Sequence, residues 1–208
     1  MKKIAIIIFA TIVYLSAYSQ EMNTLFSSND KETTFGGYGA PIIRASQVNG
    51  TFGTAIGGKG GFTINRSITF GGIGMGYVSD YAFIGDNFAG NQNADLHLGM
   101  GAGGIFLEYT IAMEKTVHIS IPINIMAGGV IISDEKIHQT NQNVDDDIES
   151  SAVFLLEPGI NIEFNVTKYF IPTLNIGYRI AMGSSLKSLS NQDLSGFHIG
   201  LEFKFGKF

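Results

Sequence analysis

The chain has 208 residues, a formal net charge of −5, 45% hydrophobic residues and only 15% charged residues. That length suits a single domain, and the low charge together with 27 glycines indicates a folded protein whose surface is not entirely in water. The absence of cysteine excludes disulfide frameworks, zinc ribbons and thiol nucleophiles. The net acidic charge argues against nucleic acid as a partner, because neutralising phosphates requires clustered lysine and arginine.

The N-terminal residues have the pattern of a secretory signal peptide. Lys2 and Lys3 precede an apolar run over residues 4–15, and the small residues Ala17 and Ser19 fit the positions before a cleavage site. The alternative is a retained membrane anchor. A run of 12 residues is short for that role, because crossing about 30 Å of hydrocarbon takes about 20 helical residues. Cleavage before the residue that follows Ser19 is therefore expected.

After this segment, apolar residues alternate with small or polar ones, which is the period of a β-strand. The C-terminus shows the pattern most clearly, because five large apolar residues fall on one face: Phe197, Ile199, Leu201, Phe203 and Phe205. The same period recurs over residues 118–125, 159–164 and 173–180. Eight strands are predicted in all, over residues 34–44, 51–64, 67–79, 94–111, 117–132, 151–165, 169–182 and 194–208.

The fourth predicted strand changes parity near the glycine pair at 103–104. Leu98 and Met100 occupy even positions before this pair, whereas Leu107 and Tyr109 occupy odd positions after it. An inserted residue exchanges the two faces of a strand, so a β-bulge would explain the change. We therefore predict a bulge at the glycine pair.

The connections between the predicted strands alternate in length. The short ones cover residues 65–66, 113–116 and 166–168, the long polar ones cover 80–93, 133–150 and 183–193, and the first hairpin loop, 45–50, is brief. An antiparallel meander with tight turns at one end and long loops at the other is typical of an outer-membrane barrel. In that layout the turns and both termini are periplasmic, and the long loops are extracellular.

The fold class predicted from these elements is all-β: a transmembrane antiparallel up-and-down β-barrel of eight strands, preceded by a cleaved signal peptide. The expected layout is a signal peptide over 1–19, a periplasmic segment over 20–33 and the barrel over 34–208. The less apolar face of the strands is mostly Gly, Ser, Asn and Ala, which suits the narrow interior of eight strands. The apolar face is then left for lipid. A secreted sandwich or a lipocalin-like barrel is the alternative.

Aromatic residues support the membrane interpretation by gathering near both ends of the predicted strands. Two girdles of aromatic side chains are a feature of membrane barrels. The residues near the short turns are Tyr109, Phe164, Tyr169, Phe170, Phe203 and Phe205. The residues near the long loops are Tyr77, Tyr81, Phe83, Phe154 and Phe197.

With its signal peptide, its alternating strand over 197–205 and its terminal Phe208, the chain resembles the small eight-stranded outer-membrane β-barrel proteins of Gram-negative bacteria. The resemblance implies recognition by the barrel-assembly machinery, with Phe203, Phe205 and Phe208 as the assembly signal. Phe208 has the parity of Lys204 rather than of Phe205, so Phe205 is expected to serve as the lipid-facing aromatic. The other expected partners are outer-membrane lipid and lipopolysaccharide, and the protein is expected to be a monomer.

Charged residues on the interior parity are expected to form a network within the barrel. They are Lys59, Glu108, Glu157, Glu163, Arg179, Glu202 and Lys204. Such residues would cross-link a narrow interior, which favours a plug over a pore. The turn at 166–168 or 167–169 places Arg179 diagonal to Glu157 or directly opposite it, so an ion pair between the two is predicted.

Glu108, His118 and Ser120 lie on two strands joined by a short turn, where an acid, a base and a nucleophile could approach one another. The pairing expected for that hairpin puts Glu108 roughly opposite Ser120. The His-x-Ser spacing also resembles the motif of outer-membrane lipid A deacylases. These residues have the interior parity near the turn end, however, whereas such an enzyme presents its hydroxyl to lipid near the outer leaflet. A hydrogen-bond cluster in the interior is therefore preferred over a hydrolase.

Three other patterns are read as structural. The run 53–60 lacks the hydroxyl residue and the helix of a phosphate-binding loop, and Gly99, Gly101 and Gly104 lack the βαβ context of a dinucleotide site. The acidic run 145–147 lacks the spacing of a helix-loop-helix calcium site and is interpreted as a solvated loop, with weak divalent-cation bridging to lipopolysaccharide phosphate as the alternative. No cofactor and no metal site is expected.

These features predict an outer-membrane protein with a structural or surface-interaction role, a filled interior and displayed loops. Binding or transport of a small or apolar ligand across the membrane is the alternative. A lipid-modifying hydrolase is a lower alternative, and enzymatic activity is not expected.

Overall fold

The computed structural model describes residues 33–77, 83–85, 94–134 and 147–208. The predicted signal peptide over 1–19 and the segment 20–32 lie outside the described residues. Residues 34–208 form one compact unit. Within the described part of the chain, no helix is long and apolar enough to cross a membrane.

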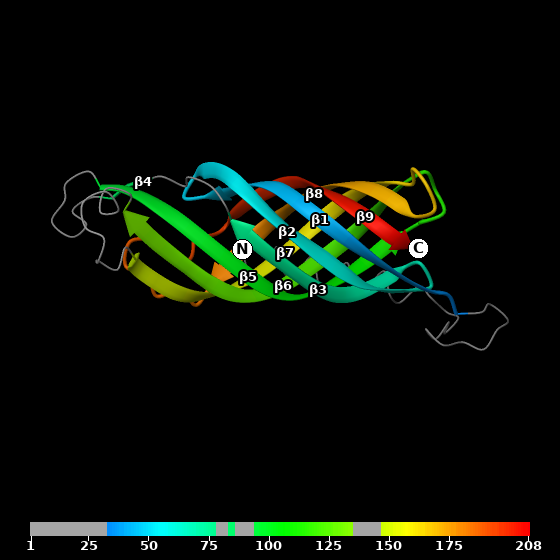
Figure 1. The fold of residues 1–208 in the computed structure, drawn as a ribbon, viewed down its shortest axis with the longest axis horizontal. Helices are drawn as coiled ribbons and strands as arrows, with labels where there is room; N and C mark the ends of the chain where they lie inside the picture. Colours follow the sequence, from blue (N-terminus) through cyan, green and yellow to red (C-terminus); the bar gives the residue numbers. More distant parts are fainter. Residues whose placement is uncertain (1–32, 78–82, 86–93, 135–146) are drawn as a thin grey trace, which may run out of the picture. The chain divides into compact units, whose positions relative to one another are not determined.

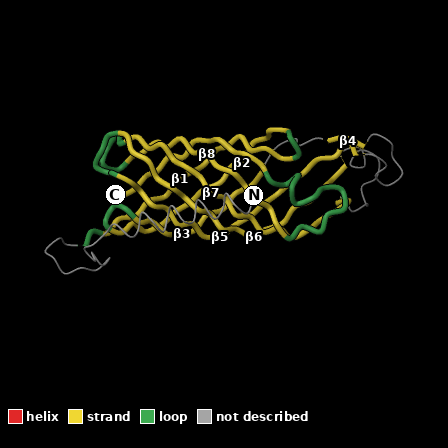
Figure 2. Tube along the Cα trace, turned by 180° about the vertical axis from the view of Figure 1, so that it is seen from behind, coloured by secondary structure: helices red, strands yellow, loops and turns green. Residues whose placement is uncertain are grey.

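The described residues are organised as antiparallel strands that close into a barrel (Figure 1 and Figure 2). The strands are β1 (Phe35–Val48), β2 (Thr51–Ile64), β3 (Ile68–Tyr77), β4 (Phe83–Gly85), β5 (Ala94–Ile111), β6 (Val117–Asp134), β7 (Asp147–Phe164), β8 (Phe170–Met182) and β9 (Gly196–Lys207). Their order around the sheet is β3-β2-β1-β9-β8-β7-β6-β5-β4, and the pairing of β3 with β5 closes the barrel. Eight strands therefore form the wall, which confirms the predicted fold, and the short β4 pairs with β5 beside it.

The tight turns 65–67, 112–116 and 165–169 lie at one end of the barrel, called the turn end, and β3, β6 and β8 end at the other, called the loop end. The first hairpin is tighter than expected. β1 continues to Val48, and Asn49 and Gly50 alone make the turn, with φ of 47° and 79°. Positive φ at both central residues is the type I′ geometry that matches strand twist, and Asn-Gly adopts it readily.

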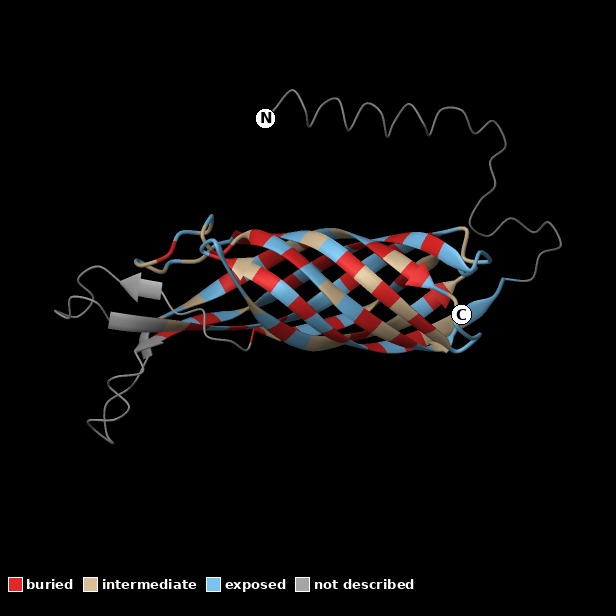
Figure 3. Ribbon diagram, turned by 90° about the horizontal axis from the view of Figure 1, so that it is seen from above, coloured by how far each residue is buried: buried red, intermediate tan, exposed pale blue. Residues whose placement is uncertain are grey.

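Inward and outward residues alternate along every wall strand, as the banded colouring of Figure 3 shows. On β6 the even residues His118, Ser120 and Asn124 are buried, whereas Ile119 and Ile121 are 46% and 44% exposed. Exposed apolar residues cover the outside of the barrel on the other strands as well. An outer surface with so many exposed apolar side chains is favourable in hydrocarbon and unfavourable in water.

The predicted bulge at 103–104 is wrong. The register of β5 runs unbroken past these glycines against both β3 and β6, from Gly74↔Gly103 to Ile73↔Gly104 on one side. Leu98 and Met100 face the interior instead of lipid, because the barrel interior is itself apolar at that level. The structure has a register shift elsewhere, between Ile132 and Ser133 of β6 where it pairs with β7.

The aromatic residues at the turn end lie outside as predicted, and Tyr109, Tyr169 and Phe205 are more than half exposed. At the loop end the expectation for Tyr77 is wrong, because its side chain faces the interior and donates a hydrogen bond to Glu157. Phe154 and Phe197 face outward there, and the side chains of Tyr81 and Phe83 lie outside the described part of the structure.

The interior is divided into two zones. Towards the loop end it is filled by apolar side chains from most of the strands, including Leu98, Met126, Val130, Ile132, Val153 and Leu155. The connection 183–195 folds back over this zone and buries Leu189 and Leu194 in it. Towards the turn end the interior is polar and charged.

One part of the outer surface carries almost no side chains. Glycines on β1, β2, β3, β5 and β6 face outward and pair across the strands, as in Gly39↔Gly60, Gly58↔Gly74, Gly60↔Gly72, Gly74↔Gly103 and Gly101↔Gly129. We call these residues the glycine face. At Gly39, Gly74 and Gly101 an added Cβ would meet no atom within 4 Å, so close packing does not require glycine there.

Candidate functional site: the interior charge network

Strand alternation places a balanced set of charges inside the barrel. Among the described residues, four carboxylates and four permanent cations are buried with at most 5% exposure: Glu108, Glu157, Glu163, Glu202, Arg44, Lys59, Arg179 and Lys204. We call these eight residues the interior charge network. It contains all seven residues that the sequence placed inside the barrel, together with Arg44.

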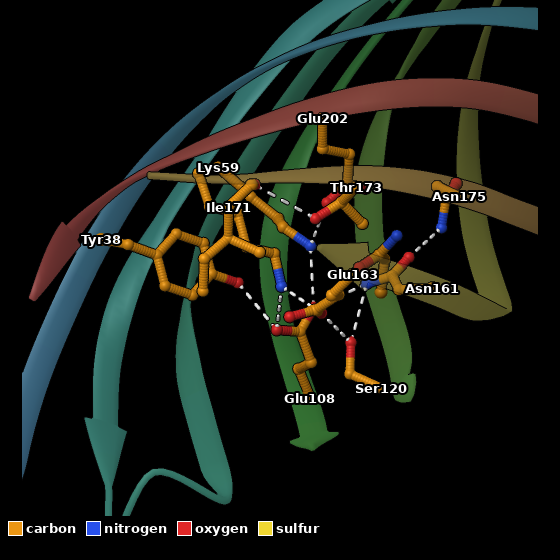
Figure 4. Close-up of polar contacts among 12 residues, drawn as sticks. Tyr38, Lys59, Glu108, Ser120, Asn161, Glu163, Ile171, Thr173, Asn175 and Glu202 are labelled. Atoms are coloured by element: carbon orange, nitrogen blue, oxygen red, sulfur yellow. Dashed lines mark hydrogen bonds and ion pairs between the residues drawn. The ribbon is translucent and has the colours of Figure 1, made fainter. Parts of the chain in front are cut away.

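Glu108 on β5 has four polar partners, of which Tyr38, Lys59 and Asn161 are labelled beside it in Figure 4. Lys59 Nζ on β2 lies 2.9 Å from one carboxylate oxygen, and Lys204 Nζ on β9 lies 2.6 Å from the other. The Tyr38 hydroxyl donates at 3.0 Å and the Asn161 amide donates at 3.0 Å. A buried carboxylate with this many donors recovers much of the hydration that it loses.

Glu163 on β7 links the network to His118 and Ser120 near the turn end. Lys204 Nζ lies 2.6 Å from Glu163 Oε1, and His118 Nε2 lies 3.0 Å from Oε2. The Ser120 hydroxyl donates to Glu163 Oε1, and the Asn161 amide donates to Ser120 Oγ at 3.1 Å. All these side chains are fully buried.

Glu202 on β9 connects Arg44 to Lys59 within the network. Lys59 Nζ lies 2.6 Å from its Oε2, and Arg44 Nη2 lies 3.4 Å from its Oε1. Lys59 is thereby shared between Glu108 and Glu202, and Lys204 between Glu108 and Glu163. The ion pairs form a continuous chain across the interior.

Glu157 on β7 is paired with Arg44, not with Arg179 as predicted. Arg44 Nη1 lies 2.9 Å from Glu157 Oε2, and the Tyr77 hydroxyl donates to Oε1 at 2.9 Å. The strand pairs Leu156↔Ile180 and Gly159↔Gly177 do place Glu157 across from Arg179. The ion pair nevertheless forms with the cation of β1, because the guanidinium of Arg179 is turned towards the loop end.

Arg179 binds neutral oxygens. Its Nε donates to the Leu194 carbonyl at 2.8 Å, its Nη1 to Ser46 Oγ at 2.9 Å and its Nη2 to the Gln47 carbonyl at 2.6 Å. Its guanidinium also lies 4.7 Å from the centre of the Tyr77 ring. Arg179 therefore fastens the connection 183–195 to the end of β1.

Aromatic rings supply further contacts to the ammonium groups. Lys204 Nζ lies 4.8 Å from the centre of the Tyr38 ring, and Lys59 Nζ lies 5.2 Å from that of Phe106. Such contacts strengthen when water is excluded. Carboxylates and aromatic faces together give Lys59 and Lys204 several partners each, and Arg44 has two carboxylate partners.

The structure does not assemble Glu108, His118 and Ser120 as expected. Ser120 pairs with Thr110, and Glu108 pairs with Pro122, because Ala112 belongs to the turn with φ of 54° and shifts the register. The carboxylate that contacts both His118 and Ser120 is Glu163. Since the Ser120 hydroxyl donates directly to that carboxylate, His118 is not positioned as its base, and the 0% exposure of Ser120 closes it to substrate.

Sequence reasoning missed Arg44, Tyr38 and Asn161 as members or partners of the network. Arg44 has the even parity of Tyr38, but the adjacent Ile42 and Ile43 hide the alternation of β1. The predicted strand also ended at Arg44, whereas β1 continues for four more residues. The sequence places Tyr38 and Asn161 on the interior parity of their strands. Neither residue carries a formal charge, so neither was assigned to the network.

The proposed assembly residues lie at the end of β9. Phe205 is 53% exposed on the outer face, where its ring stacks on Phe170 with centroids 4.8 Å apart. Phe208 lies on the opposite side and packs on the Tyr38 ring at 5.7 Å. Residues 145–146 of the acidic run lie outside the described residues, and within the described part no three His, Asp or Glu side chains are grouped to hold a metal ion.

The barrel is similar to several solved structures at low sequence identity. Neisserial surface protein A matches with a TM-score of 0.59 and 11% identity, over 86% of this chain and 100% of that one. The N-terminal barrel domain of Pseudomonas aeruginosa OprF gives 0.53 and 9%, over 82% and 96%. A major outer membrane protein from Thermus thermophilus gives 0.50 and 10%, over 81% and 99%. No family model and no curated protein matches the sequence. The chain has the fold of the small eight-stranded outer-membrane β-barrels.

Proposed function

We propose that the protein is an outer-membrane barrel with a structural or surface-interaction role, anchored by a closed interior and acting through its loops. The observation that carries the proposal is the interior charge network, in which Glu108 and Glu202 share Lys59, and Glu108 and Glu163 share Lys204. Losing one partner of a buried pair typically costs about 3–5 kcal/mol. A transport path would have to break several such pairs.

Two further features support a closed barrel. Leu189 and Leu194 of the connection 183–195 are buried in the apolar zone at the loop end. The outer surface is apolar across the middle of the wall, for example at Ile121, Ile176 and Leu201. Such a surface suits a bilayer, and a filled interior suits a protein that does not conduct.

The proposed location is tested by fractionation and by gel mobility. Mature protein is expected in the outer membrane, and in detergent it should migrate differently with and without boiling, because a closed barrel resists unfolding. Recovery as a soluble monomer without detergent would contradict the proposal. The expected orientation, with the loop end outside, is tested by protease cleavage of the connections on intact cells.

Planar-bilayer recordings test the closed interior. Purified protein is expected to give no discrete, sustained openings, because Arg44, Lys59 and Lys204 each have two carboxylate partners across the interior. Steady conductance with block by a particular solute would favour the transport alternative instead. A hydrolase is the least supported alternative, because Ser120 is fully buried and donates to Glu163.

A further inference from the structure

A cavity of about 190 Å³ opens at the turn end, where β1 begins and β9 ends. It is lined by Thr34, Phe35, Gly36, Thr63, Arg66, Lys207 and Phe208. Its two charged side chains are both cations, Arg66 on the turn between β2 and β3 and Lys207 on β9. A second cavity of about 370 Å³ lies beside it and shares Arg66 and Phe208.

The cations of the smaller cavity have no carboxylate partner among the described residues. Every carboxylate of the interior charge network is bound to Arg44, Lys59, Lys204 or other interior donors, and no ion pair reaches Arg66 or Lys207 in the described part of the chain. Both residues are exposed. This exposure places both charges within reach of an anion from outside the barrel.

The same cavity reaches the outer, apolar side of the wall. Phe35, which lines it, is 69% exposed, and the nearby Phe62 and Phe70 are 68% and 50% exposed. Phe62 pairs with Gly37 on one side and with Phe70 on the other, with ring centroids of the two phenylalanines 6.2 Å apart. An exposed aromatic surface thus lies directly beside the two cations.

We propose that this cavity binds the phosphate of a membrane phospholipid. Arg66 and Lys207 would contact the phosphate, and the acyl chains would lie along Phe35, Phe62 and Phe70. A free anion would use the two cations but not the aromatic surface, which is why a lipid is the preferred occupant. The proposal rests on the proposed function, since phospholipid surrounds this surface when the barrel spans a bilayer.

Phosphatidylglycerol binding to the folded protein in maltoside detergent, counted by native mass spectrometry, tests the proposal. Replacing both cations in R66Q/K207Q is expected to weaken binding about 30-fold, taking about 1 kcal/mol for each cation near an anionic lipid. The matched control is K115Q, which removes a turn-end cation that lines neither cavity and is expected to bind as the wild type does.

Three outcomes would overturn the proposal: no phosphatidylglycerol bound to folded wild type, an equal loss in K115Q, or displacement of the lipid by millimolar inorganic phosphate. An equal loss in K115Q would indicate diffuse attraction to the turn end, and displacement by phosphate would indicate a free-anion site. Gel mobility before and after boiling is measured on each sample. A wild type without a mobility shift would overturn the proposed function instead.

Discussion

Arg44 on β1 and Glu157 on β7 form an ion pair at 2.9 Å across the barrel interior, although β8 and β9 separate their strands in the sheet. Both side chains are at most 3% exposed. The contact joins strands that are not neighbours in the wall, so it restrains the barrel in a way that neighbouring strand pairs do not. The second carboxylate at Arg44, Glu202, extends the restraint to β9.

A double-mutant cycle is expected to show coupling between Arg44 and Glu157. Each single substitution, R44M or E157Q, should cost about 3–5 kcal/mol of unfolding free energy, because it leaves the partner buried and unpaired. The double variant should cost clearly less than the sum. Urea unfolding in lipid provides the measurement, and strictly additive losses would show that the two residues are not partners.

The equivalent cycle between Arg179 and Glu157 is the comparison. Arg179 donates to Leu194, Gln47 and Ser46 rather than to a carboxylate. R179M is therefore expected to couple to Glu157 less strongly than R44M does. Stronger coupling for Arg179 would show that Glu157 pairs with Arg179 on the neighbouring strand, as the sequence predicts.

Replacement by phenylalanine is expected to change the unfolding free energy differently at His198 and at His118. His198 is buried with neither ring nitrogen hydrogen-bonded in the described structure, whereas His118 Nε2 lies 3.0 Å from Glu163. Removing unsatisfied polar atoms is nearly neutral or stabilising, but removing a hydrogen bond to a charged group costs about 1.5–3 kcal/mol. We expect H198F to keep wild-type stability and H118F to lose it. A large loss in H198F would reveal a partner for that imidazole.

Two neighbouring glycines should differ sharply in their tolerance of alanine. A Cβ on Gly128 of β6 would overlap the carbonyl oxygen of Gly101 on β5, whereas a Cβ on Gly101 would meet nothing within 4 Å. G128A should therefore destabilise the barrel by about 1–3 kcal/mol, as overpacking does. G101A should be neutral or stabilise by about 0.4–1 kcal/mol through the unfolded chain. Equal unfolding midpoints for the two variants would contradict the inward and outward assignments.

The loop-end connection is expected to loosen in acid. Glu149 accepts hydrogen bonds from the Ser188 hydroxyl at 2.6 Å and from the Lys187 amide at 3.0 Å. Slight burial alone would raise the pKa of the Glu149 carboxyl, but the hydrogen bonds from Ser188 and the amide and charge of Lys187 outweigh it and lower that pKa. Glu149 lies on β7 beyond Phe154, where pairing with β8 ends, so it stands outside the membrane-spanning wall.

Because the folded pKa of Glu149 is lowered, its contribution is present above the ordinary carboxyl pKa and is lost as the pH falls through the lowered value. The protection of the Lys187 and Ser188 amides against hydrogen exchange, relative to their intrinsic exchange rates, should fall in that acid range. In E149Q this pH dependence should be absent, and both amides should exchange fast already at neutral pH. Unchanged protection of both amides in E149Q would show that other contacts hold the connection.

Phe205 and Phe208 should differ in their effect on assembly. Phe205 faces outward at the end of β9, whereas Phe208 packs on Tyr38. If the lipid-facing aromatic is recognised during assembly, F205A should lower the fraction of folded protein in the outer membrane more than F208A. Quantitative gels of boiled and unboiled membranes would measure that fraction, and the reverse order would assign the signal to the terminal residue.

The strand pattern was predictable wherever large apolar residues stand against small or polar ones, as over 197–205 and 118–125. Such alternation is visible because one face meets lipid and the other a polar interior. It fails at Leu98 and Met100, since near the loop end the large apolar residues of β5 face the interior and glycines such as Gly99 and Gly101 face outward. A change of interior polarity then looks like a change of parity, which is why a bulge was predicted there.

The members of the interior charge network were more predictable than the ion pairs that they form with one another. Parity alone places Glu157 and Arg179 inside, but the partner of a long side chain depends on where its end group points across the barrel. Arg44 reaches Glu157 from a strand that is not adjacent. Neighbour rules for paired strands do not include such contacts, so the pairing could be seen only in three dimensions.

The glycine face offers a practical use. Gly39, Gly74 and Gly101 point outward with open space around them, and the chain contains no cysteine. A single cysteine at any of these positions would carry a spin label or fluorophore away from the barrel wall without a competing thiol. Quenching of such labels by agents placed at known depths would then measure how far the wall is immersed, residue by residue.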